Sequence, residues 1–387
     1  MIRTTRPDSR EFEVTLMGPG TGESLVVHMG DNRWMIVDCF VDGESGEAAP
    51  LEYLRRINVD LDRVEAIVVT HLHMDHYKAI WRVHEACQKA RLILSSALTE
   101  AGALKVYAQR PENELYGTLH AASARQLPGN EPGMIRVQCG SSVRNAAACR
   151  ATAIAPTHAA CNDAEAHIAG LAARVIEARS SKDRAAARVR EITNAGEVDP
   201  DAAGTVADLL QAADDSMQKA MAEAEGGLRD ENRCSVGIHV EFSPDGPGAL
   251  LAADMVSHDQ YGWQALVSEN CVQPCGKVSL LKVPHHGSEH NDCGELWDRW
   301  VDAGAVALVA PFRSSGLPRD SDIARIQQRS GSIWQAAPSS RARDVVDGTD
   351  STPKTGIVQA RWSHATSTWT LATDGPAFRH RVSTPHP

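Results

Sequence analysis

Residues 64–76 read Val-Glu-Ala-Ile-Val-Val-Thr-His-Leu-His-Met-Asp-His, so four side chains able to bind metal ions follow a nearly continuous apolar run. A β-branched, apolar run of this length is typical of a strand buried on both faces. Side chains two positions apart on a strand share a face, so we expect His71 and His73 to bind one ion together. Asp75 and His76 follow where the chain turns into a helix, and we expect them to face a second position nearby. The stretch therefore predicts a metal site at the end of a buried strand.

The chain around this stretch has the pattern of an α/β protein. Apolar segments at 12–17, 24–29 and 34–37 are separated by turn residues and predict a β-meander. Residues 49–57 and 77–90 carry apolar side chains at helical spacing, so each predicts a helix.

The composition changes between residues 99 and 232. From 163 to 229 the chain is rich in Ala, Glu, Arg and Asp, with breaks near 194–196 and at Asp199-Pro200. This pattern predicts two helices, arranged as a hairpin, that either pack on the core or form an arm for dimerisation or partner binding. The expected apolar stripes consist of Leu171, Val175, Val189 and Ile192 on the first helix and Val206, Leu209, Leu210, Met217 and Met221 on the second.

Strand-like segments resume after this region. We therefore expect one domain in two halves, residues 1–98 and 233–375, with an insertion at 99–232 that includes the turn Pro156-Thr157-His158. The insertion should be largely helical after residue 163, and residues 376–387 should form a loose tail. The later strands are expected at 235–242, 249–253, 278–283, 306–310, 356–362 and 368–372, with a helix near 323–328.

The composition limits the classes of function. Hydrophobic residues make up 42% of the 387 residues and charged residues 23%, so disorder of the whole chain is not expected. The formal net charge of −11 argues against a broad cationic surface that binds nucleic acid non-specifically. Bound divalent metals would offset part of this charge, so a substrate that bears phosphate stays compatible with it.

The sequence favours a cytoplasmic protein that does not bind membranes. No apolar run has the length of a membrane-spanning helix, and the first residues lead into no apolar stretch of signal-peptide length. The nine cysteines are scattered over a long chain, which favours reduced thiols. Cys271 and Cys275 are the closest pair, but no second Cys/His pair stands nearby, which argues against a structural zinc site there.

The motif His71-x-His73-x-Asp75-His76 at the end of a strand resembles the hallmark of the metallo-β-lactamase superfamily. Further parts of that pattern follow in order, with Asp38 and Asp254 each at the end of a strand and a Val-Pro-His-His-Gly-Ser segment at 283–288. The resemblance implies an αββα sandwich of the metallo-β-lactamase type, in which two mixed β-sheets are flanked by helices, here with a helical insertion.

Within the superfamily, three segments look most like the hydrolase domain of bacterial competence DNA-uptake proteins. These are the early turn at 20–24, the stretch at 232–236 before a strand pair, and the His-His-Gly-Ser sequence at 285–288. That branch is associated with nucleic-acid degradation, so the resemblance implies a phosphodiester substrate.

The resemblance also implies two divalent metal ions. His71 and His73 would hold the first ion, Asp75 and His76 the second, and Asp254 would bridge them. Carboxylate oxygen and imidazole nitrogen suit zinc, and also manganese or iron, so the ligands alone do not name the ion.

Four other residues have expected roles from the same resemblance. His286 is preferred over His285 as the last ligand, because relatives with His-x-Ser here use the histidine two before the serine. His285 would then lie beside the metals or donate a proton, and Asp38 would orient a ligand loop. His158 is either a further ligand of the first ion or an exposed turn residue, and the competence-type branch often lacks this histidine.

These residues predict a metal-dependent hydrolase, a phosphodiesterase or nuclease. Two ions about 3.5–4 Å apart can share a hydroxide nucleophile, which Asp75 would orient. The alternatives are hydrolysis of another bond, such as a lactone, thioester or amide, and a regulated subunit of a larger complex, for example in phage defence. In the last case the helical insertion would bind a partner protein; a homodimer through the insertion is the other expectation.

Overall fold

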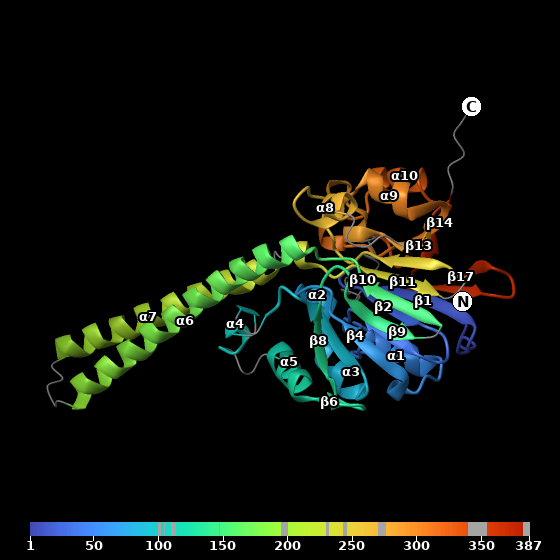
Figure 1. The fold of residues 1–387 in the computed structure, drawn as a ribbon. Helices are drawn as coiled ribbons and strands as arrows, with labels where there is room; N and C mark the ends of the chain where they lie inside the picture. The colour runs from blue at the N-terminus through green and yellow to red at the C-terminus, as the bar shows by residue number, and fades with distance from the viewer. Residues whose placement is uncertain are drawn as a thin grey trace, which may run out of the picture.

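The computed structural model describes residues 1–99, 102–103, 105–109, 114–146, 148–194, 200–229, 232–242, 246–269, 276–339 and 354–381. Two eight-stranded sheets form its centre, and helices cover the outer face of each sheet (Figure 1). The expected arrangement of two mixed sheets flanked by helices is confirmed. The closest cysteine pair, Cys271 and Cys275, lies outside the described residues.

The first sheet has an antiparallel half and a parallel half. Its strand β4 (Val64–Val68) lies between two parallel neighbours and has both faces covered, which explains its nearly continuous apolar sequence. The strand order is β17 (Thr368–Asp374), β16 (Gly356–Ser363), β1 (Glu11–Gly18), β2 (Ser24–His28), β3 (Trp34–Val37), β4, β5 (Arg91–Ser95) and β8 (Met134–Val137).

The second sheet is also mixed, with parallel pairing through its middle strands. Its strand order is β18 (Phe378–Arg379), β15 (Ser332–Gln335), β14 (Val301–Val309), β13 (Val278–Lys282), β12 (Gly248–Leu251), β11 (Ile238–Phe242), β10 (Cys149–Ala153) and β9 (Ser142–Ala146). A separate short pair joins β6 (Gln126–Leu127) and β7 (Glu131–Pro132).

Three large apolar clusters hold these layers together. Alternation along β2 shows how they are separated, because Leu25 and Val27 belong to the cluster between the sheets whereas Val26 belongs to the cluster under the first helical layer. The first layer includes α1 (Ala49–Arg56), α3 (Ile80–Ala86) and α5 (Glu114–Ala124), and α8 (Gly262–Glu269), α9 (Gly294–Trp300) and α10 (Asp320–Gln327) form the layer against the second sheet.

The structure differs from the sequence-based expectation at three places. The single helix expected at 77–90 is two helices, α2 (Met74–Tyr77) and α3, because Ala79 leaves the helical conformation at φ −106° and ψ 13°. The expected insertion contains β8, β9 and β10, so 134–153 belongs to the sandwich. The expected tail contains β18, which pairs with β15 through Phe378 and Arg379.

The helices α6 (His158–Asn194) and α7 (Pro200–Arg229) form a long hairpin that projects from the sandwich (Figure 1). With 37 residues, α6 extends roughly 55 Å. Leu171 and Val175 pack with Met217 and Met221 in the apolar cluster of the first helical layer, so the base of the hairpin is part of the domain core. Leu209 and Leu210 are exposed instead of lying in the buried stripe.

Six shorter elements complete the described chain: the helical turn α4 (Lys105–Tyr107) and the 3-10 turns η1 (Leu61–Arg63), η3 (Asn232–Cys234), η4 (Pro284–Gly287), η5 (Glu289–Asn291) and η6 (Arg313–Ser315). None of the helices in the described part of the chain combines the length and the apolar character needed to cross a membrane.

Two neighbouring glycines near the end of α7 test the packing of this hairpin. An added Cβ at Gly226 would meet no atom within 4 Å, whereas one at Gly227 would lie 2.6 Å from Leu171 Cδ1. We expect Gly226→Ala to raise the free energy of unfolding by about 0.5–1 kcal/mol through helix propensity. Gly227→Ala should give no such gain, because Leu171 must move. Equal gains in urea unfolding would contradict the packing of α7 against α6.

Candidate metal centre

The expected metal ligands come together where parallel strands of the two sheets end. The chain segments that follow β3, β4, β12 and β13 all contribute, so the site lies between the carboxyl ends of strands from both sheets. These segments supply Asp38 after β3, His71, His73, Asp75 and His76 after β4, Asp254 after β12, and His285 and His286 in the turn η4 (Pro284–Gly287) after β13.

The turns that carry these residues adopt an unusual backbone conformation. Asp38, Ala253, His285 and His286 have φ values of 58°, 46°, 45° and 55°, in the left-handed region that side chains with a Cβ rarely enter. Such conformations cost on the order of 1–3 kcal/mol each and persist where the surroundings enforce them. These strained turns therefore lower the stability of the fold and, at the same time, position the side chains of this site.

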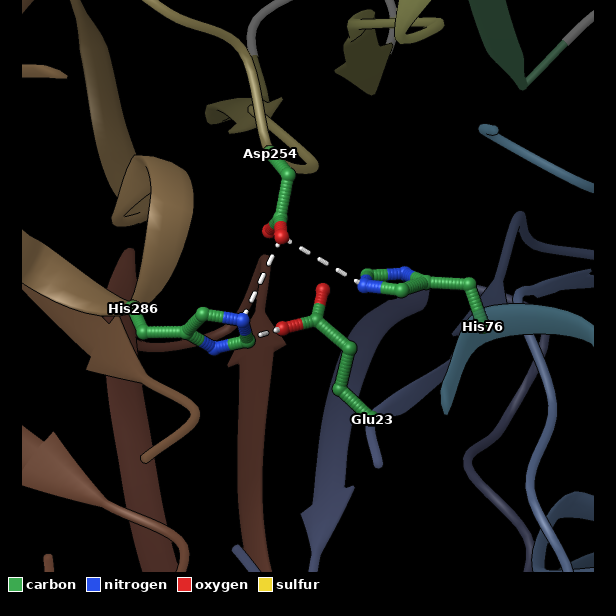
Figure 2. Close-up of side chains that lie close together, drawn as sticks. All are labelled: Glu23, His76, Asp254 and His286. Atoms are coloured by element: carbon green, nitrogen blue, oxygen red, sulfur yellow. Dashed lines mark ion pairs between the residues drawn. The ribbon is translucent and has the colours of Figure 1, made fainter. Parts of the chain in front are cut away.

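Two groups of side chains with ligand atoms meet at Asp254. One contains His71, His73 and Asp254, and the other contains Glu23, His76, Asp254 and His286 (Figure 2). Within each group the ligand atoms lie within 4.8 Å of one another. Asp254 Oδ2 is 3.2 Å from His286 Nε2, 3.6 Å from His76 Nε2 and 4.0 Å from His71 Nε2. A carboxylate shared in this way has the position of a bridging ligand.

The hydrogen bonds of Asp38 fix the histidine tautomers. Its carboxylate accepts from Thr70 N at 2.8 Å, from Thr70 Oγ1 at 2.7 Å and from His76 Nδ1 at 2.7 Å. Because the Thr70 hydroxyl donates to Asp38, it must accept from His71 Nδ1, which lies 3.0 Å away. Both rings thus carry a proton on Nδ1, and each Nε2 faces Asp254.

The ring of His286 is oriented by a similar contact. Its Nδ1 donates to the carbonyl oxygen of Ala310 at 3.0 Å, and the ring stacks on Phe312 with centroids 5.0 Å apart. Its Nε2 therefore also faces Asp254. Three imidazole nitrogens thus converge on one carboxylate.

Several atoms at this centre are buried without a hydrogen bond. Among the described residues, these include Nε2 of His71, Nε2 of His76, Oδ1 of Asp254 and Oε2 of Glu23. Unpaired buried polar groups are costly and rare in folded proteins. Nitrogen and oxygen lone pairs that point into one space fit divalent cations such as zinc, manganese or iron.

The pKa values of the histidines reflect the crowding of charge. Burial lowers the pKa of His71 well below its usual range, and the neighbouring His76 adds to this effect. Burial would also lower the pKa of His76 and of His286, but nearby carboxylates, Asp38 foremost for His76 and Asp254 for His286, raise both. Binding of a cation would displace a ring proton from His76 and from His286, so the affinity for metal should fall as the pH falls.

The other expected site residues lie at different distances from this centre. Asp75 is half-buried, with Oδ2 3.5 Å from His76 Nε2, but belongs to neither group. His285 is half-buried, and its Nδ1 lies 3.3 Å from the carbonyl oxygen of Asp254. His158 is exposed at the start of α6 and lies in neither group, because the preceding Thr157 takes the buried place in that turn.

Two buried charged residues of the centre were absent from the sequence-based expectation. Glu23 precedes the buried strand β2, and Lys282 ends the apolar strand β13; both are fully buried. Lys282 Nζ lies 2.6 Å from Glu23 Oε1, 3.7 Å from Asp254 Oδ1 and 3.0 Å from the carbonyl oxygen of Ala253. The signal that could have found Lys282 is a lone charge in an apolar strand that leads into the paired histidines.

Residues 17–132 match the family model described as the metallo-beta-lactamase superfamily. A HARLDQ motif mutant of a metallo-beta-lactamase from Cronobacter sakazakii is 13% identical, with a TM-score of 0.34 over 71% of this chain and 77% of that chain. A subclass B3 metallo-beta-lactamase from a soil metagenome library is 12% identical, with a TM-score of 0.32 over 76% and 81%. The short form of human tRNase Z is 12% identical, with a TM-score of 0.30 over 70% and 76%. Comparison with curated proteins gives no match.

The matched segment contains the turn of Glu23 and the His-rich turn after β4. Residues 17–132 are therefore similar to the metallo-β-lactamase superfamily, and the two mixed sheets flanked by helices match the fold expected for it.

The role of Asp38 can be tested with Asp38→Asn. The amide nitrogen of Asn would donate where the carboxylate accepts, so His76 would have to accept at Nδ1 and carry its proton on Nε2. We expect the affinity for metal at one of two sites to fall by about 10–100-fold. Isothermal titration with Zn²⁺ would measure this, with exposed Asp302→Asn as the matched control. Unchanged affinities in a folded Asp38→Asn variant would contradict the role.

Proposed function

We propose that this chain, on the basis of its similarity to the metallo-β-lactamase superfamily, is a metal-dependent hydrolase of phosphodiester bonds. The observation that carries this proposal is the sharing of Asp254 by two groups of ligand-type side chains. Bound at both positions, divalent ions would lower the pKa of a water and neutralise the charge that develops in an in-line displacement. Zinc is the proposed ion, with manganese or iron as the alternatives that the same ligand chemistry admits.

The half-buried residues of the centre are the ones that substrate can reach. His73, Asp75 and His285 keep partial exposure, whereas His71, His76 and His286 are buried. In the proposed reaction Asp75 orients the attacking water as a hydrogen-bond acceptor. His285 donates from Nδ1 to a backbone carbonyl, which leaves Nε2 to hold or give a proton at the leaving oxygen.

A phosphodiester is supported by the resemblance to the hydrolase domain of competence DNA-uptake proteins, in the turn 20–24, the stretch 232–236 and the His-His-Gly-Ser segment. The net charge of −11 opposes an extended track for a polyanion. We therefore favour a short phosphodiester, such as a nucleotide, over long nucleic acid.

Metal content and hydrolysis of bis(p-nitrophenyl) phosphate test this function together. We expect close to two metals per wild-type chain, about one in His73→Ala, and at least a 100-fold loss of turnover in Asp75→Ala, because general acid-base groups typically contribute 10²–10⁴. His158→Ala is the matched histidine control and should keep both metal and activity, because His158 lies outside both groups.

Lactone, thioester and amide substrates should react more slowly than phosphodiesters. An intact wild-type protein that stays empty after soaking with zinc and manganese would overturn the proposal.

The hairpin of α6 and α7 is the proposed contact with a second copy of this chain. Ile176, Leu209 and Leu210 are exposed by 40%, 45% and 36%, which places apolar side chains on its outer surface. Residues 174–191 of α6 contain six Lys or Arg against three Asp or Glu, whereas residues 206–227 of α7 contain five Asp or Glu against one Lys. Lys182 of α6 pairs with Asp214 of α7 within one chain, and the remaining opposite charges favour α6 of one copy against α7 of another.

The oligomeric state measured by light scattering tests this contact. We expect twice the mass of one chain for the wild type and the mass of a single chain for Leu209→Glu/Leu210→Glu, because charges would be buried at the interface. Gln328→Glu adds a charge on the exposed surface of the domain and should leave the mass unchanged. If the wild-type protein has the molar mass of one chain at tens of micromolar, the hairpin does not form a dimer contact.

A further inference from the structure

Glu23 is tied to the metal centre through the backbone as well as the side chain. Its N–H donates to the carbonyl oxygen of Asp75 at 3.2 Å, so its backbone is attached to the His-rich turn. An added Cβ on the preceding Gly22 would lie 2.8 Å from Phe40 Cβ and 3.1 Å from that same carbonyl oxygen. The close approach that glycine permits thus brings Glu23 into the centre.

The carboxylate of Glu23 points into the space between His76, Asp254 and His286 (Figure 2). Its Oε2 lies 3.6 Å from His286 Nδ1, and its group belongs to the same ligand set within 4.8 Å. The neighbouring His76 Nε2 and Asp254 Oδ1 are fully buried and make no hydrogen bond. Ligand-type atoms of Glu23, His76 and Asp254 are therefore buried close together without a hydrogen bond.

A salt bridge with Lys282 accounts for only part of this arrangement. Four carboxylates, those of Asp38, Asp75, Asp254 and Glu23, gather at the centre, and among the described residues the ammonium of Lys282 contacts two of them, Glu23 and Asp254. Buried charge without compensation is strongly unfavourable. Lys282 contacts Oε1 of Glu23 and leaves Oε2 without a hydrogen bond. A carboxylate has lone pairs on both oxygens, so one can contact the ammonium while the other binds an ion.

We propose that Glu23 is a ligand of the ion held by His76, Asp254 and His286, and that Lys282 is the positioning residue that aims this carboxylate. The proposal deepens the proposed function and rests on it for the presence of metal. It makes the second position a site with two imidazoles and two carboxylates, richer in oxygen than the position of His71 and His73. Oxygen-rich sites suit Mn²⁺ better than nitrogen-rich sites do.

Titration of the metal-free protein with Zn²⁺ and, separately, with Mn²⁺ tests the proposal without any measurement of activity. The variants are Glu23→Gln, which keeps the shape and removes the charge, and Glu23→Gln/Lys282→Met, which removes both charges. In each we expect at least a tenfold loss of affinity at one site, larger for Mn²⁺, with the other site unchanged. His73→Ala is the matched variant for the other site. It should lose affinity at the position of His71 and His73 and keep the affinity of the position of His76 and His286.

The double variant separates a ligand from a structural counter-ion. If Glu23 only neutralised Lys282, removal of both charges would restore wild-type affinity, and that result would overturn the proposal. The double variant also avoids a buried lysine without a counter-ion, because Lys282 is replaced by Met. The test therefore stays valid if Glu23→Gln alone does not fold. A wild type that binds no metal would overturn the proposed function itself, whereas two wild-type affinities in the double variant would overturn this inference alone.

Discussion

The carboxylate of Asp254 faces the Nε2 atoms of His71, His76 and His286. The other ring nitrogen of these histidines contacts Thr70, Asp38 and Ala310, respectively. Charges and lone pairs buried this deeply must be matched within a few ångströms. That requirement fixes where the strands of both sheets end relative to one another. The two sheets contribute opposite walls of one polar centre, so a shift between them would separate its members.

The surrounding turns are arranged to satisfy this requirement. Asp38, Ala253 and the paired histidines adopt left-handed backbone conformations that an isolated peptide would avoid. The carbonyl oxygen of Ala253 accepts from both His285 N and Lys282 Nζ, so one strained turn is supported by two donors. Local strain is thus balanced by hydrogen bonds that exist only in the folded domain.

Much of this fold could be predicted from the sequence, because it depends on local periodicity. The buried strand β4 and the shared face of His71 and His73 follow from a spacing of two residues. The strands β8 to β10 were missed, since their side chains are mixed and the helical composition of the neighbouring segment dominated the pattern. The outward position of His158 depends on which residue of a turn is buried, and spacing does not specify that.

Glu23 and Lys282 were missed for a different reason. A single charged residue beside apolar positions predicts a solvent-facing side chain unless a partner is known. Their contact joins the turn before β2 of one sheet to the end of β13 of the other, so only the three-dimensional arrangement brings the two charges together. Pairing between residues far apart in sequence leaves no periodic signal in a single chain.

Only the base of the α6–α7 hairpin packs into the domain core, so the length of the hairpin beyond this base can change without loss of core packing. Ala178 and Met217 are the outermost hairpin residues in the apolar cluster of the first helical layer, and the described helices continue beyond them toward the tip. Removing seven residues from each helix beyond that point would shorten the hairpin by about 10 Å without opening the core. The length of the hairpin can therefore change in steps of whole turns, while its root stays part of the domain.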